Sequence, residues 1–253
     1  TIFLIIIFYI GFIAYSDFSD FQINISTVKI EFLVLSCILS FMGLLIAGIR
    51  QKILLDKINV KISIKENILL YLSGVGFLVT PGGSGEMIKA YFLKQKYGYK
   101  TSKTLPLVIV EKFSDLVAMS VIIGLCIFII PNIEIFIFWL FFITLVSSAY
   151  VILKNKFLFS KLIKIAQRLP IIKKQILTIE ESYTEFITML SKETLFKTSV
   201  VSVASWICFS LAIFMVFLSF NLTFDYFYAT MVVFSSLIFG AISFLPAGIG
   251  ITE

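Results

Sequence analysis

The sequence predicts an all-α, polytopic membrane protein with inverted repeats and re-entrant broken helices. Hydrophobic residues make up 59% of the 253 residues and charged residues only 14%, and the mean hydropathy is +1.04. Several apolar runs reach about 18 residues or more, the length at which a helix crosses a bilayer. Two Pro-Gly sequences, TPGGSGE at 80–86 and PAGIG at 246–250, interrupt apolar segments. A water-soluble core could not enclose 28 Phe with this much Ile and Leu.

The first elements are two spans and two loops of opposite charge character. Residues 1–15 predict a first span, which we expect to be truncated because the chain starts inside an apolar run without a leader. The loop at 16–29 is acidic, whereas a second span at 30–49 ends at Arg50 and precedes the lysine-rich loop 50–67. By the positive-inside rule, loop 50–67 is cytoplasmic and loop 16–29 is outside.

A re-entrant hairpin is predicted over 68–97. The apolar run Ile68 to Val79 is about 18 Å long as a helix, too short for a hydrocarbon core of about 30 Å. After the break, a second helical stretch from Glu86 to about Tyr97 leads into the basic loop 94–103, so both flanks are basic. A hairpin that enters the membrane and returns to the cytoplasmic side explains both the short helices and the basic residues on both flanks. An ordinary kinked span is the alternative.

The chain then crosses twice and enters a basic segment. A span at 104–130 carries Glu111, Lys112 and Asp115, and a span at 135–153 returns to the cytoplasm. The segment 154–197 predicts a basic amphipathic helix on the inner leaflet, ended by Pro170, and a second helix through Glu180, Glu181 and Glu185. A plain cytosolic linker is the alternative.

The two Pro-Gly breaks indicate an inverted repeat. Spans at 198–220 and 226–245 lead into the second break, which is approached from outside, whereas the first is approached from the cytoplasm. We therefore predict a first membrane repeat at 1–153, a cytoplasmic segment at 154–197 and the start of a second, truncated repeat at 198–253, with further helices after it, in the cell (plasma) membrane. Two coincidental kinks are the alternative, because Gly and Pro are common in membrane helices. The residues that recur are Pro81, Gly83 and Gly85 as Pro246, Gly248 and Gly250, with Glu86 and Glu253 after them.

The broken helix suits an anion. Ser84 can cap a new helix whose free N–H groups and positive dipole end attract a phosphate, and Lys89 adds a full charge. Glu86 acts either as a capping residue or as a ligand of a cationic or hydroxylated head group. The predicted substrate-binding residues are Thr80, Gly82, Gly83, Ser84, Gly85, Glu86, Lys89, Glu111, Asp115, Gly248, Gly250 and Glu253.

Charges inside a span are functional candidates because lipid exposure costs several kcal/mol. Glu111 and Asp115 lie on one helical face with Lys112 between them in the sequence, although these three side chains can instead reach the interface or pair with one another. We expect Trp139 and Trp206 to be lipid-facing or interfacial. We expect the three cysteines, Cys37, Cys126 and Cys208, to be buried free thiols.

Several classes of chemistry lack support. The chain has no His, which removes the usual general base and argues weakly against an enzyme, and PGGSGE lacks the GK[ST] of an ATP-binding loop. We predict no catalytic residue, cofactor, metal or nucleic-acid partner. The expected partner is a membrane phospholipid or a lipid-linked head group.

Three stretches, GFLVTPGGSGEMIKAYFLKQKYG at 76–98, EKFSDL at 111–116 and FLPAGIGITE at 244–253, together resemble the lysylphosphatidylglycerol synthase transmembrane region, a flippase-like family. The resemblance implies a Pro-Gly turn followed by an acidic and a basic residue, here Glu86 and Lys89. It also implies a Glu-Arg pair followed by Asp, here with Lys112 in place of the Arg, which removes a bidentate contact. It implies the lipid-handling part of the family without the soluble aminoacyl-transferase domain.

The resulting hypothesis is a lipid flippase-like transporter that moves a phosphate-bearing lipid, either an aminoacylated phospholipid or a lipid-linked sugar, between leaflets. Two alternatives stay open: a membrane-embedded transferase acting on a lipid phosphate, and an accessory subunit of a cell-envelope enzyme that docks through 154–197.

Overall fold

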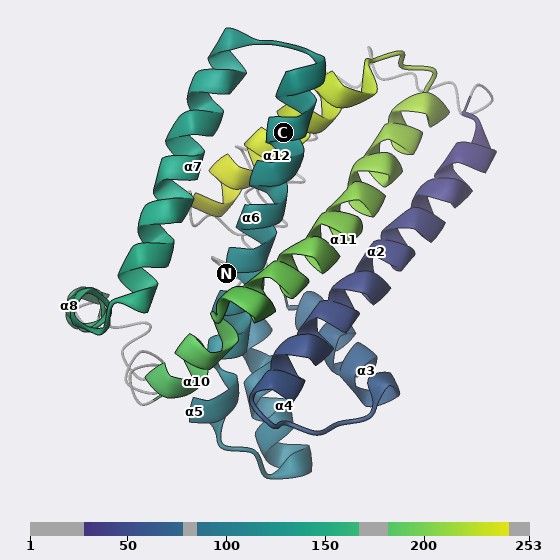
Figure 1. Cartoon of the computed structure of the whole chain (residues 1–253). Helices are drawn as coiled ribbons and strands as arrows, with labels where there is room; N and C mark the ends of the chain where they lie inside the picture. Colours follow the sequence, from purple (N-terminus) through teal and green to yellow (C-terminus); the bar gives the residue numbers. More distant parts are fainter. Residues whose placement is uncertain (1–27, 78–84, 167–181, 243–253) are drawn as a thin grey trace, which may run out of the picture.

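The computed structural model of the chain describes residues 28–77, 85–166 and 182–242, and every regular element in these ranges is a helix (Figure 1). Four helical stretches are long and apolar enough to cross a membrane. The predicted class, an all-α polytopic membrane protein, is confirmed. The four stretches are α2 (Ile30–Lys57), α5 with α6 (Thr101–Ile129), α7 (Ile133–Lys154) and α11 (Lys192–Ser219).

The long helices α2 and α11 lie side by side along their length (Figure 1). A Cβ atom on Gly43 would lie 3.1 Å from the Phe209 ring, and the Ser205 hydroxyl donates to the Gly43 carbonyl at 2.8 Å. Small residues let two helix backbones approach closely, which is how membrane helices associate without a hydrophobic driving force. Helices α2 and α11 therefore form a closely packed pair within the bundle.

The faces of these helices reverse the pattern of a soluble protein. On α11, Thr198, Ser202 and Ser205 are buried, whereas on α2 the large apolar Val34 and Phe41 are exposed. Outward apolar and inward polar side chains are expected where lipid surrounds the bundle. The buried polar stripe is where a site can form.

Helices α6 (Pro106–Ile129) and α7 form an antiparallel pair beside α2 and α11. Pro106 stands in the first turn of α6, where its missing N–H costs nothing. A Cβ atom on Gly124 would lie 2.6 Å from the Trp139 ring, and the Trp139 indole donates to the Ser120 carbonyl at 2.7 Å. The half-buried Trp139 ring therefore joins α7 to α6, and its predicted lipid-facing or interfacial position stays a prediction.

The helix ends fall into two groups (Figure 1). The C-terminal end of α2 lies at the bottom with α5 (Thr101–Thr104), α8 (Lys156–Ala166) and α10 (Tyr183–Met189), and we call this the lysine-rich end. The α6–α7 turn lies at the opposite end, as does the turn between α11 and α12 (Tyr226–Ile242). This arrangement agrees with the predicted alternation of loops. The assignment of the lysine-rich end to the cytoplasm stays a prediction.

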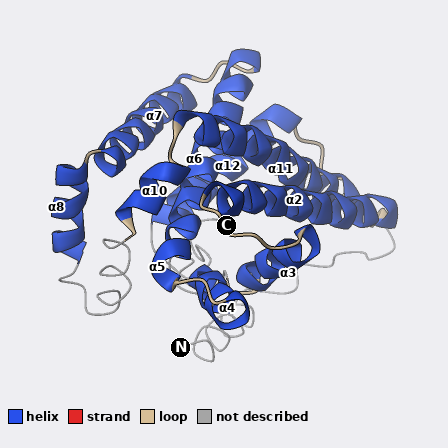
Figure 2. Cartoon of the chain, turned by 60° about the horizontal axis from the view of Figure 1, so that its bottom comes forward, coloured by secondary structure: helices blue, strands red, loops and turns tan. Residues whose placement is uncertain are grey.

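Two short helices, α3 (Ile64–Val75) and α4 (Ile88–Tyr97), lie at the lysine-rich end beside α2 (Figures 1 and 2). They contain 12 and 10 residues, and neither reaches the length of a span. They have the lengths that a re-entrant hairpin needs. Its tip at 78–84 lies outside the described residues, so the re-entrant path stays a prediction, as does the inverted repeat, whose second break lies at 246–250.

Three predicted boundaries are corrected. Helix α2 continues to Lys57, so Arg50 lies within a helix, 2% exposed, rather than at the start of a loop. Helix α3 begins at Ile64 instead of Ile68, and α11 begins at Lys192 instead of Thr198. Each helix extends because polar residues continue a helix as readily as apolar ones once they leave the hydrocarbon region or find buried partners. The N-terminal span, Pro170, Glu180 and Glu181 lie outside the described residues.

The cysteines only partly follow the prediction. All three are free thiols, but only Cys126 is buried, while Cys208 is half-buried and Cys37 is exposed on α2. Cys37 therefore faces outward like the apolar side chains around it.

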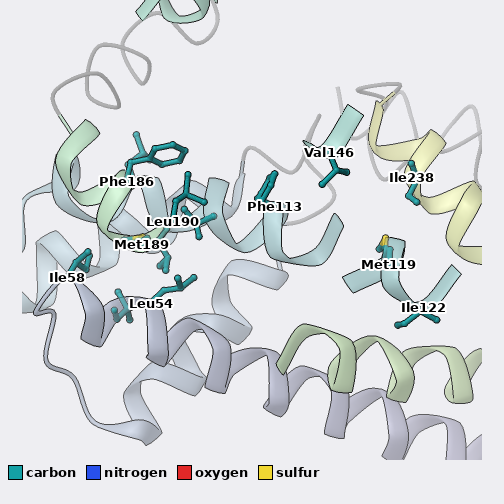
Figure 3. Packing of buried hydrophobic residues seen from close by; sticks show 14 of the residues in the cluster. Leu54, Ile58, Phe113, Met119, Ile122, Val146, Phe186, Met189, Leu190 and Ile238 are labelled. Atoms are coloured by element: carbon teal, nitrogen blue, oxygen red, sulfur yellow. The ribbon is translucent and has the colours of Figure 1, made fainter. Parts of the chain in front are cut away.

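Apolar side chains close the lysine-rich end of the bundle (Figure 3). Leu54 and Ile58 of α2 lie near Met189 and Leu190 of the α10 end, and each is no more than 4% exposed. Phe186 adds a third apolar side chain from α10. All five side chains belong to one cluster of buried hydrophobic residues.

A capping box starts α3, and its Glu66 carboxylate also contacts α4. The Ser63 hydroxyl accepts from the Glu66 backbone N–H, and the Glu66 carboxylate accepts from the Ser63 N–H, both at 3.3 Å. Lys96 of α4 donates to the same carboxylate at 3.0 Å. Hydrogen bonds from the Tyr97 and Lys96 side chains lower the pKa of Glu66 from 4.5 to about 2.

We expect Glu66→Gln to lower the melting temperature at pH 7 by no more than a few degrees, because the contact is solvent-exposed. A depressed pKa contributes stability above pH 4.5 that is lost as the pH falls toward 2. Thermal unfolding in detergent at pH 7 and pH 3 should therefore show a narrower gap between variant and wild type at the lower pH. Glu31→Gln, at an exposed glutamate in the first turn of α2, serves as the control. A gap that widens on acidification would contradict the assignment.

Candidate functional site

Lys89 is the centre of a buried ionic arrangement. Its ammonium group lies 3.2 Å from the Glu86 carboxylate and 2.5 Å from the Glu111 carboxylate, and the exposed fractions of the three side chains are 1%, 5% and 1%. Glu86 and Lys89 come from the turn and first residues of α4, while Glu111 comes from α6. The chain thus brings two of its predicted site segments into direct contact.

Asp115 forms a second buried ion pair, with Arg50 of α2. The Arg50 guanidinium also donates to the Ser202 hydroxyl at 2.8 Å, and the Trp206 indole donates to Asp115 at 2.8 Å. Asp115 therefore connects α2, α6 and α11. The alternative in which Glu111, Lys112 and Asp115 pair with one another is wrong, because each of the three pairs with a residue outside this group. Trp206 is half-buried and donates to Asp115, and its predicted lipid-facing or interfacial position stays a prediction.

Lys112 is an exposed cation at the edge of the site. Its ammonium group pairs with Glu86, and its side chain is 46% exposed, whereas that of Glu86 is 5% exposed. We call the six residues Arg50, Glu86, Lys89, Glu111, Lys112 and Asp115 the charged cluster. It holds three cations and three carboxylates, so its formal charges sum to zero.

Helix α3 creates the space that Lys89 occupies. A Cβ atom on Gly74 would lie 2.7 Å from the Lys89 Cδ atom, so any larger residue would displace the lysine stem. The Tyr71 ring centroid lies 5.3 Å from the Lys89 ammonium group, a favourable cation–π geometry. The lysine is therefore placed by α3 and held by the two carboxylates.

Hydrogen bonds between polar side chains fix the helices around the charged cluster. Gln51 donates to Asn67 at 3.0 Å, and Asn67 donates to the Gly48 carbonyl at 2.7 Å, which joins α3 to α2. The hydroxyls of Ser114 and Thr198 lie 3.0 Å apart and join α6 to α11. The helix rotations that face the charges inward are thus set by neutral contacts as well as by ion pairs.

Three polar atoms of the charged cluster are buried without a hydrogen-bond partner among the described residues: Nε of Arg50, Oε1 of Glu111 and Oε1 of Glu86. Of these, only Oε1 of Glu86 has an ion-pair contact within the described ranges, with Lys112. Such an atom costs about 1–3 kcal/mol unless something satisfies it. Buried unsatisfied groups in a native structure call for a water, an ion or a ligand nearby. The charged cluster therefore retains hydrogen-bonding capacity beyond its own ion pairs.

The predicted site residues divide by what the structure describes. Glu86, Lys89, Glu111 and Asp115 gather in the charged cluster, and Gly85 lies in the turn beside them. The others, Thr80, Gly82, Gly83, Ser84, Gly248, Gly250 and Glu253, lie outside the described residues, and their contribution stays a prediction.

Arg50 is the residue of the charged cluster that sequence reasoning missed. It ends an apolar run and starts a lysine-rich stretch, the pattern of a loop cation. The available signal was indirect: a carboxylate such as Asp115 inside a span needs a cation from another helix. Lys112 is a charge inside a predicted span, but its pairing with Glu86 depends on how the start of α4 packs against α6.

The comparisons agree with the resemblance found in the sequence. The family model described as Lysylphosphatidylglycerol synthase TM region matches residues 2–253. Neither the search of curated proteins nor the search of solved structures found a match.

Proposed function

This chain belongs to the lysylphosphatidylglycerol synthase TM region family, and on that premise we propose that it is a flippase-like transporter moving a phosphate-bearing lipid between leaflets. Membership relates the chain to membrane proteins of lipid modification or flipping. The family description names an aminoacylated phospholipid, so the cargo we propose is of that class or a lipid-linked sugar.

The observation that carries this proposal is the charged cluster itself. Ionised side chains inside a membrane bundle are expensive, and those that persist mark substrate or ion pathways. Lysine ammonium groups suit a lipid phosphate, while the carboxylates suit the ammonium group of an aminoacylated lipid. The charged cluster offers both signs within a few ångströms of each other, at Lys89, Glu86 and Glu111.

Lys112 is the entry point that we propose for the head group. It is the accessible cation of the charged cluster and is neutralised by Glu86. An arriving phosphate can take the place of the Glu86 carboxylate at Lys112, while Glu86 keeps its contact with Lys89. Such an exchange of one anion for another avoids leaving a buried charge unpaired, which would cost several kcal/mol.

The lipid tails would stay in the bilayer throughout. Moving each CH₂ group from hydrocarbon to water costs about 0.8 kcal/mol, so a transporter needs to enclose only the polar end. The predicted turns at 80–86 and 246–253 would bound the polar path, as broken helices do in transporters with inverted repeats.

Leaflet exchange in vesicles tests the proposal. The protein is reconstituted into phosphatidylcholine vesicles that contain a fluorescent aminoacylated phosphatidylglycerol, and outer-leaflet dye is quenched chemically to follow exchange. We expect Lys112→Gln to slow exchange by about tenfold or more, because a charge-assisted hydrogen bond contributes about 1.5–3 kcal/mol.

Lys96→Gln is the matched control, since Lys96 is also an exposed lysine paired with a glutamate, Glu66, but lies outside the charged cluster. Exchange in this control should stay within about twofold of wild type, as for a surface pair. Equal rates in wild type, Lys112→Gln and protein-free vesicles would refute transport of this lipid class. A new covalent lipid product would instead favour a transferase.

A further inference from the structure

A groove with a volume of about 540 Å³ opens between α6, α7 and α11. In Figure 1, α6 lies between α7 and α11. The groove is lined by nonpolar residues of α6 and α11 and has polar groups at a few positions. The residues used below are Val117, Val121, Tyr150, Lys192, Ser199 and Val200.

None of the residues that line the groove belongs to the charged cluster. The hydrogen bond between Ser114 and Thr198 ties α6 to α11, and Ser199 is the next residue along α11. Val121 and Val200 are 46% and 52% exposed, so the groove is open to the surroundings of the bundle. At the depth of a membrane span, those surroundings are acyl chains.

Two polar side chains, Lys192 and Ser199, lie in the mostly apolar lining of the groove. Lys192 starts α11 at the lysine-rich end and has no ion-pair partner within the described ranges. The Ser199 hydroxyl oxygen is buried and has no hydrogen-bond partner in the part of the chain that the structure describes. A buried hydroxyl without a partner inside an apolar groove has capacity for a ligand's polar atom.

We propose that this groove is a binding site for an anionic glycerophospholipid, with one acyl chain along Val117, Val121 and Val200 and the phosphate at Lys192. Charge complementarity selects this occupant, because an unpaired lysine at the interface attracts an anionic head group. The Ser199 hydroxyl can donate to an ester carbonyl, a group that a phospholipid carries and an apolar helix lacks. The proposal concerns binding and does not depend on transport.

Photolabelling tests the site. The full chain is placed in phosphatidylcholine vesicles with phosphatidylglycerol that carries a diazirine on one acyl chain, and labelled peptides are identified by mass spectrometry. We expect labelling of the α6 and α11 peptides that line the groove to exceed labelling of the exposed face of α2. The same diazirine on phosphatidylcholine should label the groove about fivefold less, since one interfacial lysine contributes about 1 kcal/mol for an anionic lipid.

Two substitutions decide the outcome. Val200→Trp should remove most labelling of the groove, whereas Val34→Trp, at a position of α2 that is 54% exposed, should leave it unchanged. Lys192→Gln should reduce the preference for phosphatidylglycerol to near equality without abolishing labelling. The proposal is overturned by even labelling of all exposed helices or by an unchanged preference in Lys192→Gln.

Discussion

Replacing Asp115 by leucine is expected to lower the free energy of unfolding by about 3–5 kcal/mol, because the change leaves the buried Arg50 guanidinium without its carboxylate. Arg50 is 2% exposed and keeps only the Ser202 hydroxyl as a hydrogen-bond partner among the described residues. The Trp206 indole loses its acceptor in the same step. Unfolding in mixed micelles with increasing SDS measures the difference.

A double variant separates the charge effect from packing. Arg50→Met with Asp115→Leu removes both charges, and replacing a buried pair by apolar residues is often neutral or stabilising. Most of the lost stability should therefore return. Asp56→Leu is the control, since its pair with Lys52 lies on the surface and should cost no more than about 1 kcal/mol. A double variant as unstable as Asp115→Leu would show that the carboxylate acts by something other than pairing with Arg50.

Lys89→Met is expected to have an effect of similar size, about 3–5 kcal/mol, for the opposite reason. It leaves Glu86 and Glu111 facing the same buried space without the cation that they share, and two nearby carboxylates destabilise one another's charged forms. The same SDS titration measures it. Lys65→Met, at an exposed lysine of α3, should stay within about 0.5 kcal/mol of wild type.

The other contacts of Glu86 and Glu111 predict which second substitution restores the stability that Lys89→Met loses. Glu86 retains Lys112 when Lys89 is lost, whereas Glu111 retains no lysine among the described residues. Lys89→Met with Glu111→Met should therefore recover most of the stability, and Lys89→Met with Glu86→Met should recover little, because it leaves Glu111 unpaired. The reverse order of rescue would contradict the pairing described here.

These rescues bear on why the charged cluster exists. If apolar substitutes fold as well as the ion pairs, stability is not what maintains six ionised groups inside the bundle. The double variants can then be placed in the leaflet-exchange assay as folded proteins without the proposed site. Loss of exchange in a stable double variant would assign the charges to transport rather than to folding.

Much of the fold could be predicted from local composition. The apolar run at 30–49 and the span around Glu111 and Asp115 are visible because hydropathy and helix length are properties of consecutive residues. The same holds for the short helices α3 and α4, and the family match over residues 2–253 confirms the resemblance carried by the Pro-Gly and EKFSDL sequences. The helix ends are what local sequence predicts least well. Arg50 has the pattern of a loop cation because it ends an apolar run and starts a lysine-rich stretch.

The sequence by itself determined that this is a helical membrane protein and which spans carry charge, because the cost of placing a residue in lipid depends mainly on that residue and its immediate neighbours. Only the tertiary structure decided that Asp115 belongs to Arg50 and that Lys89 is shared by Glu86 and Glu111. Those pairings depend on how α2, α4, α6 and α11 are rotated against one another. The rotations are set by close contacts at small residues such as Gly43 and Gly74, which act between segments far apart in the chain.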